Sequence, residues 1–292
     1  MERAAAMTQA ANEKSSLLVF DSLGTPEGAM AAAKQAVKAR AGIVIGPLLA
    51  SEVPAVLRVT QKRLPVISFS NDAALLDSGA FVFGITPHQT VAAILRYAAA
   101  RGVKRVGLVS GVGGWGQQAL LAGTEVGKQV ALETTPLLTP VLAGGADALP
   151  DAVLVTDAAQ LAQIAPAAAA LGVQVLGALP SLDLSPEVLR QLEGAWFAAP
   201  DPGGFAGFAR AFEERNGSRP GTITGLAYDA LNIVRQLRSG GGTDRSALLS
   251  ATGFKGVCGD VRFRDDGSVA RSLAVLVVTG GQLHKVAASS VS

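Results

Sequence analysis

The stretch GIVIGPLLASEVPAVLRVTQKRLPVISFS, residues 42–70, decides the fold of this chain. It contains an aliphatic run at 42–45, a segment of helix length at 51–61 and a second aliphatic run at 65–69. Aliphatic runs of strand length that alternate with segments of helix length predict βαβ units around a parallel sheet. The stretch therefore predicts an α/β fold.

The same alternation continues on both sides of this stretch. Further strands are predicted at 17–20, 81–85, 105–110, 129–132, 152–155, 173–176 and 195–198, and further helices at 26–40, 87–100, 115–128, 158–171, 186–192, 205–216 and 222–237. Thr25 and Ser185 each precede a proline, which predicts a capped helix start. After the last helix the pattern is extended at 259–263, 272–278 and 282–286, with a turn signal at Asp266-Gly267.

The composition excludes several classes of protein. A hydrophobic fraction of 49% with only 16% charged residues is typical of a compact globular chain. The net charge of +2 comes without a basic stripe, so we expect no nucleic-acid partner. Cys258 is the single cysteine, which rules out an internal disulfide. No run of about 18 apolar residues occurs, so the sequence predicts no transmembrane helix.

One motif is similar to a cofactor site. Residues 111–116, GVGGWG, match the dinucleotide fingerprint Gly-x-Gly-x-x-Gly between a predicted strand and a predicted helix. Trp115 would crowd the helix start where a pyrophosphate sits, so we expect no cofactor. His88 and His284 lie far apart without a Cys/His cluster, and we expect no metal site. Without a Gly-x-Ser-x-Gly motif or a Cys near a His, we expect no enzymatic activity.

Polar residues follow two of the predicted strands, where open α/β sheets bind ligands. Ser51 follows the strand at 42–45 and opens a helix, and Ser70, Asn71 and Asp72 follow the strand at 65–69. Hydroxyls and N–H groups at helix starts suit a carboxylate or another anion. The alternative is that these side chains only cap their own helices.

Several segments, in this order along the chain, are similar to those of one protein family. They are 21–29 (DSLGTPEGA), 42–47 (GIVIGP) with Ser51, 64–70 (LPVISFS), Trp115-Gly116, Tyr228-Asp229-Ala230 and the region from Gly256 to Phe263. The chain resembles the Leu/Ile/Val-type periplasmic binding proteins, which are type I solute receptors. Within that superfamily, 25–29 and 68–72 look most like the branch of penicillin-binding protein activators.

The resemblance implies a function without catalysis. A periplasmic receptor of this family delivers a small polar ligand, such as an amino acid, to an ABC permease after its lobes close around the ligand. A member of the activator branch is instead a lipoprotein that regulates peptidoglycan synthesis by contacting a penicillin-binding protein. The positions that the resemblance assigns to ligand binding are Ser51, Ser70, Asn71, Asp72, Trp115, Thr156 and Asp183.

The resemblance also implies the division of the chain. We expect two doubly wound parallel-sheet lobes joined by three crossovers, near 99–103, 217–223 and 256–272. The first lobe would comprise 1–100 with 222–256, the second 101–221 with 272–292, and residues 257–271 would form the last crossover. The helix at 222–237 is expected in the first lobe.

The first lobe is expected to lack its first strand. Family members begin with an aliphatic strand and a helix before the strand that corresponds to 17–20, whereas this sequence starts in that helix. Ala4, Met7 and Ala11 follow helical spacing. We therefore expect Met1 to be an internal methionine of a longer protein, whose preceding residues encode the strand and an export or lipoprotein signal.

Overall fold

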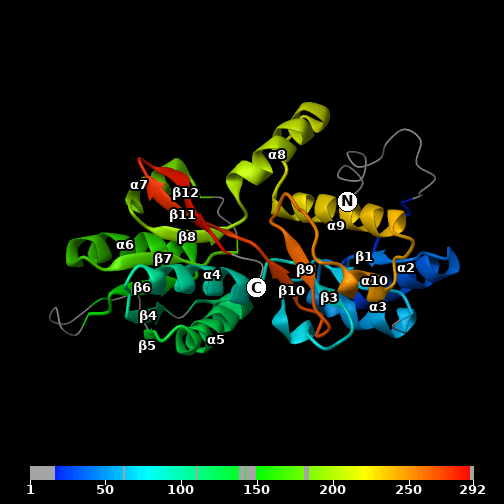
Figure 1. Ribbon diagram of the computed structural model, residues 1–292, viewed down its shortest axis with the longest axis horizontal. Coiled ribbons are helices and arrows are strands. Elements are labelled where there is room, and N and C mark those ends of the chain that lie inside the picture. Colours follow the sequence, from blue (N-terminus) through cyan, green and yellow to red (C-terminus); the bar gives the residue numbers. More distant parts are fainter. Residues whose placement is uncertain are drawn as a thin grey trace. The chain divides into compact units, whose positions relative to one another are not determined.

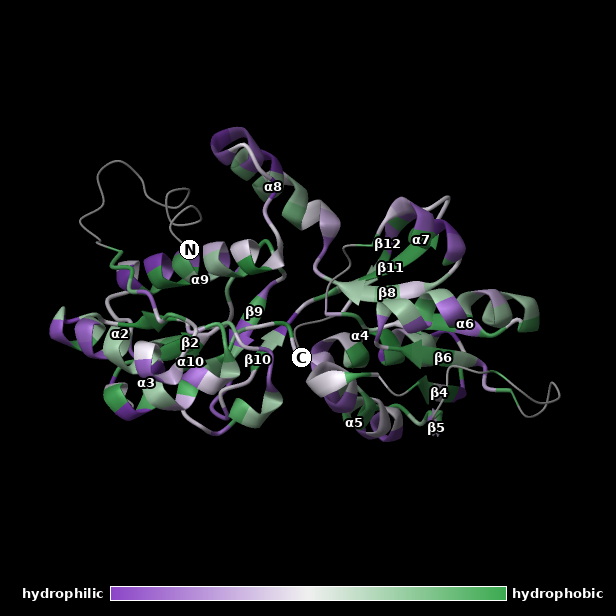
Figure 2. Ribbon diagram, turned by 180° about the vertical axis from the view of Figure 1, so that it is seen from behind, coloured by the Kyte–Doolittle hydropathy of each residue, from purple (hydrophilic) through white to green (hydrophobic). Residues whose placement is uncertain are grey.

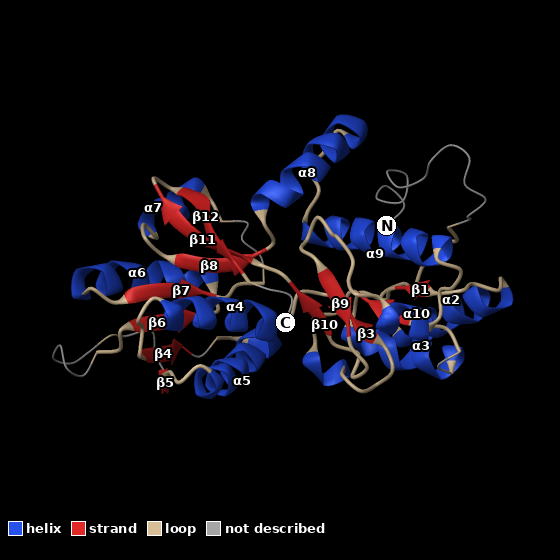
Figure 3. Cartoon of the chain, viewed as in Figure 1, coloured by secondary structure: helices blue, strands red, loops and turns tan. Residues whose placement is uncertain are grey.

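The computed structural model describes residues 17–61, 63–109, 111–137, 142, 149–180 and 184–289 (Figure 1). Within these residues the chain forms two compact units. Unit 1 comprises 17–84 and 202–272, and unit 2 comprises 85–201 and 273–289. Parallel strands with helices beside them build both units (Figure 3), which confirms the predicted α/β class.

Unit 1 contains a parallel sheet in the order β1-β2-β3. Its elements are β1 (Val44–Ile45), β2 (Val66–Ser68), β3 (Phe81–Val82), α2 (Pro26–Lys38), α3 (Val53–Thr60), α8 (Pro202–Asn216), α9 (Thr222–Ser239), α10 (Arg245–Ser250), β9 (Val261–Phe263) and β10 (Val269–Arg271), with short 3₁₀ turns at Ala50–Glu52 and Ala73–Leu75. The predicted cap of α2 is confirmed, because the Gly28 N–H donates to Thr25 Oγ1 over 3.0 Å.

Helices cover both faces of the sheet in unit 1. Val66 and Val82 pack with Ala29 and Ala33 of α2 and with residues of α3 in one core cluster. Since side chains alternate along a strand, Ile45 and Ile67 point to the opposite face, where α9 runs (Figure 1). The β9–β10 hairpin adds Phe263, whose ring is 5.0 Å from that of Phe81.

Unit 2 contains a sheet in the order β12-β11-β8-β7-β6-β4-β5. Its elements are β4 (Arg105–Val109), β5 (Glu133–Leu137), β6 (Ala152–Val155), β7 (Gln174–Gly177), β8 (Trp196–Ala199), β11 (Ala274–Thr279), β12 (Gln282–Ala288), α4 (Pro87–Ala100), α5 (Gly113–Gln129), α6 (Ala158–Leu171) and α7 (Pro186–Gln191). The strands from β5 to β8 are parallel, and β11 pairs antiparallel with β8 and β12.

Strand residues of unit 2 alternate between two aliphatic cores. Leu108, Leu154 and Leu176 pack with α4 and α5, and Val153 and Val175 pack with α6 on the other face. Figure 2 shows the apolar colour along β4 and β6. A strand that is apolar on both sides must be covered by helices on both sides, and this explains the continuous aliphatic runs of the sequence.

The junctions between the units differ from those expected from the sequence. The chain leaves unit 1 after Gly84, returns at Pro202 and leaves again after Ser272. The first two junctions thus fall one helix earlier than expected. The first lies before α4, because α4 packs on the unit 2 sheet. The second lies before α8, because the Phe208 ring of α8 is 4.7 Å from the Tyr228 ring of α9 in unit 1. Most of the stretch 257–271, expected as a crossover, forms the β9–β10 hairpin of unit 1.

Two predicted strands are wrong. Residues 17–20 have no secondary structure, since no described strand pairs with them. Residues 129–132 contain the end of α5 and the turn after it, and the strand follows as β5. β5 lies at the edge of its sheet and is largely exposed, so its sequence carries no apolar signal.

A buried polar group joins α9 to the loop before β9. Both carboxylate oxygens of Asp229 accept hydrogen bonds, from Val257 N–H at 2.7 Å and from Cys258 N–H at 2.9 Å. Arg271, also buried, donates to Cys258 O over 3.1 Å and to Phe83 O over 2.8 Å. Burial raises the pKa of Asp229 to about 6, although both N–H groups and the charge of Arg271 favour its ionised form.

This pKa predicts how the stability of unit 1 depends on pH. Between pH 3.8, the ordinary pKa of an aspartate, and about pH 6, folded Asp229 binds a proton that the unfolded chain has lost. The free energy of unfolding therefore falls as pH rises through this window, by up to about 3 kcal/mol. We expect Asp229→Asn to lack this dependence. Urea unfolding between pH 4 and 7 measures the free energy of unfolding of both proteins. The same pH dependence in the original chain and in Asp229→Asn would contradict the prediction.

Candidate functional site

The carboxyl ends of three parallel strands form one edge of unit 2. β4, β6 and β7 run in the same direction, so the residues that follow them, Gly111, Thr156 and Ala178, lie at the same edge. The Ala178 N–H donates to Val155 O over 3.0 Å, which extends the ladder up to the residue before Thr156. We call Gly111, Trp115, Thr156 and Ala178 the unit 2 edge.

Trp115 lies in the first turn of α5 and reaches back to the strand ends. Its indole Nε1 donates to Ala178 O over 2.9 Å, and the side chain is half-buried. A half-buried indole offers an apolar surface while its single donor is satisfied by the protein. The hydrogen bond thus fixes the ring at the unit 2 edge.

Thr156 is the most unusual polar residue of this edge. It is 5% exposed, and its Oγ1 has no hydrogen-bond partner among the described residues. A Cβ at Gly111 would overlap Thr156 Oγ1, so a larger residue at 111 would collide with this hydroxyl. A buried hydroxyl without a partner costs free energy, which a ligand that bonds to it would recover.

The glycine motif at 111–116 has a packing explanation. A Cβ at Gly116 would overlap the backbone of Gly111, so the two glycines allow the loop to lie against the first turn of α5. Gly113 adopts a φ of +72°, which favours glycine. Trp115 spans the edge to Ala178. The glycines are therefore explained without a dinucleotide.

In unit 1, the residues after β1 and β2 form a second edge. Pro47 O accepts hydrogen bonds from Ser68 Oγ at 2.9 Å and Phe69 N at 3.0 Å. Ser68 Oγ in turn accepts from Ser70 N–H, and Ser70 Oγ accepts from Asp72 N–H at 3.2 Å. Ser70 is buried, and accepting this bond leaves its own hydroxyl proton available for donation.

The remaining predicted residues of unit 1 are less specialised. Asp72 accepts from Ala74 N–H over 2.9 Å and caps the 3₁₀ turn at Ala73–Leu75, as the capping alternative predicted. Ser51 and Asn71 are exposed. Asp183, the predicted acid of the second lobe, lies outside the described residues.

The sequence missed part of both sites. Ala178 contributes only a backbone carbonyl, and because every residue has one, the sequence cannot indicate this role. Gly111 was noticed only as part of a cofactor motif, although its closeness to Thr156 is what shapes the unit 2 edge. Within the described ranges, no group of three or more His, Cys, Asp or Glu residues could hold a metal ion. Among the helices described, none is long and apolar enough to cross a membrane.

The fold with its two edges defines a class of α/β binding proteins, and comparison with known proteins is more specific. Residues 2–282 match the model of the family described as periplasmic binding protein. The chain belongs to this family, which confirms the family predicted from the sequence. The match does not single out the penicillin-binding protein activator branch. A comparison with curated proteins found no significant match.

Solved structures share the fold at low sequence identity. A putative branched-chain amino acid ABC transporter from Rhodospirillum rubrum has a TM-score of 0.76 at 21% identity, covering 98% of this chain and 91% of its own. The leucine-, isoleucine-, valine-, threonine- and alanine-binding protein from Brucella ovis has a TM-score of 0.71 at 16% identity, covering 99% and 89%. A solute binding protein of an ABC transporter from Rhodopseudomonas palustris BisB5, in complex with 3,4-dihydroxy benzoic acid, has a TM-score of 0.67 at 17% identity. The match covers 99% of this chain and 92% of that protein.

Proposed function

We propose that this chain is a periplasmic solute receptor of an ABC-type transport system and that it binds a small carboxylate without catalysis. The observation that carries this proposal is the buried Thr156 hydroxyl, which lacks a partner among the described residues at the carboxyl edge of its sheet. In open α/β sheets this edge is where ligands bind. The hydroxyl can donate to a carboxylate oxygen, and the Trp115 ring offers an apolar surface to the rest of the ligand.

The unit 1 edge supports the same class of ligand. Ser70 keeps a hydroxyl proton to donate; its backbone N–H is held by Ser68 Oγ, and its own Oγ is held by the Asp72 N–H. Groups that are held in place before binding lose little conformational entropy on binding. Similar proteins support a small carboxylate as well, since the Brucella ovis protein binds leucine among other amino acids and the Rhodopseudomonas palustris protein is in complex with 3,4-dihydroxy benzoic acid.

A thermal-shift screen of the purified chain tests this function. It should include aliphatic amino acids, benzoate-type acids and peptidoglycan fragments. A ligand at one hundred times its Kd stabilises the folded state by about 2.7 kcal/mol, so a rise in Tm with an amino acid or aromatic acid is expected. A flat response to all compounds would count against the receptor. Retention of a penicillin-binding protein by the immobilised chain would then favour the regulator of peptidoglycan synthesis.

Thr156→Val should separate binding from stability. The substitution removes a hydroxyl that bonds to no described residue and keeps the shape of the side chain. We expect Kd for the ligand found in the screen to rise about 2- to 13-fold, the equivalent of one hydrogen bond of 0.5–1.5 kcal/mol. Tm without ligand should stay the same or rise, because a buried unpaired polar group is lost. Calorimetric titration and thermal unfolding measure the two effects.

Two matched variants complete this experiment. Thr156→Ser keeps the hydroxyl and should bind the ligand with nearly the original Kd. Trp115→Phe loses the hydrogen bond to Ala178 O and should weaken binding by releasing the ring. A fall in Tm for Thr156→Val with an unchanged Kd would show that the hydroxyl has a structural role and would remove the main support for the proposal.

A further inference from the structure

Acidic residues are unevenly distributed along the chain. Residues 28–71 contain six of its 25 Lys and Arg residues but only one of its 23 Asp and Glu residues. That single acid, Glu52, is 1% exposed. The part of unit 1 that this segment builds therefore presents positive charge to solvent without a negative charge of its own to balance it.

The folded chain collects these charges on one surface. α2 and α3 pack directly against each other and contribute to one core cluster (Figure 1). Their buried residues face this cluster, whereas Lys34 and Lys38 of α2 and Arg58 of α3 are exposed. These residues are too far apart in the sequence to form a basic run, and only the packing of the two helices brings them onto one surface.

Two further cations lie where the same helices end. Arg40 follows α2 and precedes β1, and Arg63 follows α3 and precedes β2. Because β1 and β2 are parallel and pair at Val44 and Val66, both arginines lie at the edge where these strands begin. Both are exposed. We call this group of residues the basic face: Lys34, Lys38, Arg40, Arg58 and Arg63.

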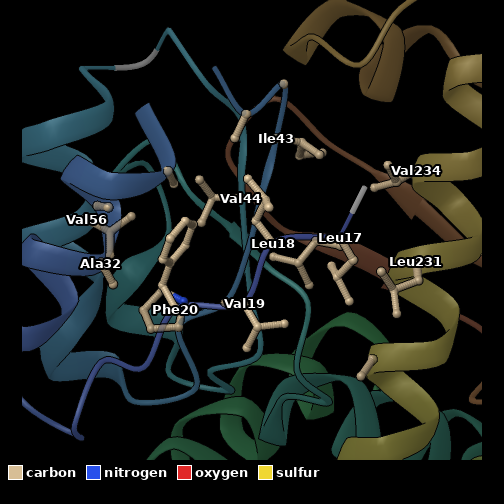
Figure 4. Close-up of a pocket in the computed structure, with 18 of the residues that line it drawn as sticks. Leu17, Leu18, Val19, Phe20, Ala32, Ile43, Val44, Val56, Leu231 and Val234 are labelled. Atoms are coloured by element: carbon tan, nitrogen blue, oxygen red, sulfur yellow. The ribbon is translucent and has the colours of Figure 1, made fainter. Parts of the chain in front are cut away.

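The basic face is separate from the cavity beside β1. That cavity has a volume of about 840 Å³, and Figure 4 shows Ala32 of α2 and Val44 of β1 at its wall. Of the basic face, only Arg40 borders it; Lys34 and Lys38 lie on the outer side of α2. A chain segment that filled the cavity would therefore leave most of the basic face exposed.

The side chains of the basic face have no partner among the described residues. None of them forms a hydrogen bond or an ion pair there, whereas Arg105 in unit 2 pairs with Asp151. The helix dipole favours a cation in the last turn of a helix, where Lys38 and Arg58 lie. This explains one cation for each helix and leaves the other three without a role in the fold.

We propose that the basic face binds the surface of a bilayer that contains anionic phospholipids. Clusters of about four to eight Lys and Arg residues attract anionic headgroups, and each cation near the surface adds to the attraction. The side chains are long and are not held by the protein, so each can reach a headgroup in a fluid layer.

The composition of the basic face favours a membrane over an acidic protein. Protein interfaces are enriched in aromatic residues and depleted of lysine. Residues 28–71 contain one aromatic residue, Phe69, and it is buried. Val37, beside Lys38, is 43% exposed and offers only a small apolar contact. The face thus lacks the rigid anchors of a protein interface and suits a mobile layer of headgroups.

The basic face lies away from the residues proposed to bind a solute. Arg63 precedes β2 and Ser70 follows it, so they lie at opposite ends of this strand. A membrane at the basic face therefore leaves the unit 1 edge accessible. We expect the Kd for a solute to be the same with and without vesicles.

Co-sedimentation of the full chain with vesicles tests the proposal. The vesicles contain phosphatidylcholine with about 30% phosphatidylglycerol, and vesicles of phosphatidylcholine alone are the reference. At an ionic strength of about 0.05 M we expect binding to the anionic vesicles only. This binding should disappear at about 1 M salt, where the Debye length falls to ~3 Å.

Two double variants locate the binding surface. Each cation near an anionic bilayer contributes ~1 kcal/mol, about fivefold in the partition coefficient, so Lys34→Gln with Lys38→Gln should bind about 25-fold more weakly. Its Tm should change little, because neither side chain has a described partner. Lys104→Gln with Lys128→Gln removes the same charge from exposed positions of unit 2 and should leave vesicle binding nearly unchanged.

Several outcomes would overturn the proposal. They are equal binding to both kinds of vesicle, no binding to anionic vesicles at low salt, and the same loss of binding in both double variants. Displacement from the vesicles by polyglutamate at an equal concentration of negative charge would also contradict it and would favour an acidic protein partner. No solute is present in these measurements, so their result is independent of the solute screen.

Discussion

Replacement of Arg271 with methionine is expected to lower the free energy of unfolding of unit 1 by about 3–5 kcal/mol. The guanidinium is buried and donates to Cys258 O and Phe83 O, and it stacks 4.8 Å from the centre of the Phe83 ring. Methionine fills a similar volume but leaves both carbonyls without these donors. It also removes the cation that helps to keep Asp229 ionised.

The measurement must report on unit 1 alone. Both tryptophans, Trp115 and Trp196, belong to unit 2, so their fluorescence does not follow this change. Hydrogen exchange of peptides from α9 and β9 during urea unfolding gives the stability of unit 1 directly. A double variant that also carries Asp229→Asn should lose less than the sum of the two single losses, because it contains no unpaired charge. A loss below about 1 kcal/mol for Arg271→Met would refute the expected effect.

Replacement of Phe197 with alanine should destabilise unit 2 by a similar amount, about 3–5 kcal/mol. Phe197 is fully buried in the core on the α6 side of the sheet. It pairs with Gly177 of β7 and with Leu276 of β11, so its ring lies where a parallel strand and an antiparallel strand meet. Removal of the ring leaves a cavity that the surrounding strands cannot easily close.

Gly177 provides the matched control for this substitution. A Cβ at Gly177 would overlap the Phe197 ring, so Gly177→Ala alone should destabilise unit 2 by about 1–3 kcal/mol. When Gly177→Ala is added to Phe197→Ala, its methyl group enters the space that the ring has left. The second substitution should then lower the stability of unit 2 only slightly or raise it. Urea unfolding followed by tryptophan fluorescence measures all four proteins. Additive losses in the double variant would contradict the contact between these residues.

Local chemistry made the helices predictable. α4 and α6 have the bounds expected from the sequence, and the predicted cap of α7 is confirmed because Val188 N–H donates to Ser185 Oγ. Capping residues, prolines and glycines act within a few residues of their own position, so a single sequence contains the full signal. Gly172 follows α6 with a φ of +69°, as a left-handed cap requires.

Pairing and long-range contacts were not predictable in the same way. The aliphatic residues 17–20 have the composition of a strand, but a strand also needs a neighbour, and no described strand lies beside them. The junctions between the units depend on which sheet or helix α4 and α8 pack against. The spacing of apolar residues predicts a helix but not its packing partner. Asp229 belonged to a segment noted for its resemblance, yet its bonds to Val257 and Cys258 join residues that are distant in sequence.

The site shows the same limit. Trp115 and Thr156 were expected at ligand-binding positions, and the structure places both at the unit 2 edge; their contact with a ligand stays a prediction. The bond from Trp115 to Ala178 and the unpaired hydroxyl of Thr156 are properties of the folded backbone. Residue types alone could indicate the edge of the sheet but could not show which of its polar groups the protein leaves unsatisfied.

The interleaved path of the chain has a consequence for folding on the ribosome. Unit 1 needs α9 and the β9–β10 hairpin, and unit 2 needs β11 between β8 and β12. Synthesis proceeds from the N-terminus, so unit 1 stays incomplete until Ser272 has emerged and unit 2 until β12 has followed. From the emergence of β8 until β11 follows it, β8 therefore exposes an unpaired apolar edge, and the nascent chain should depend on chaperones during this interval.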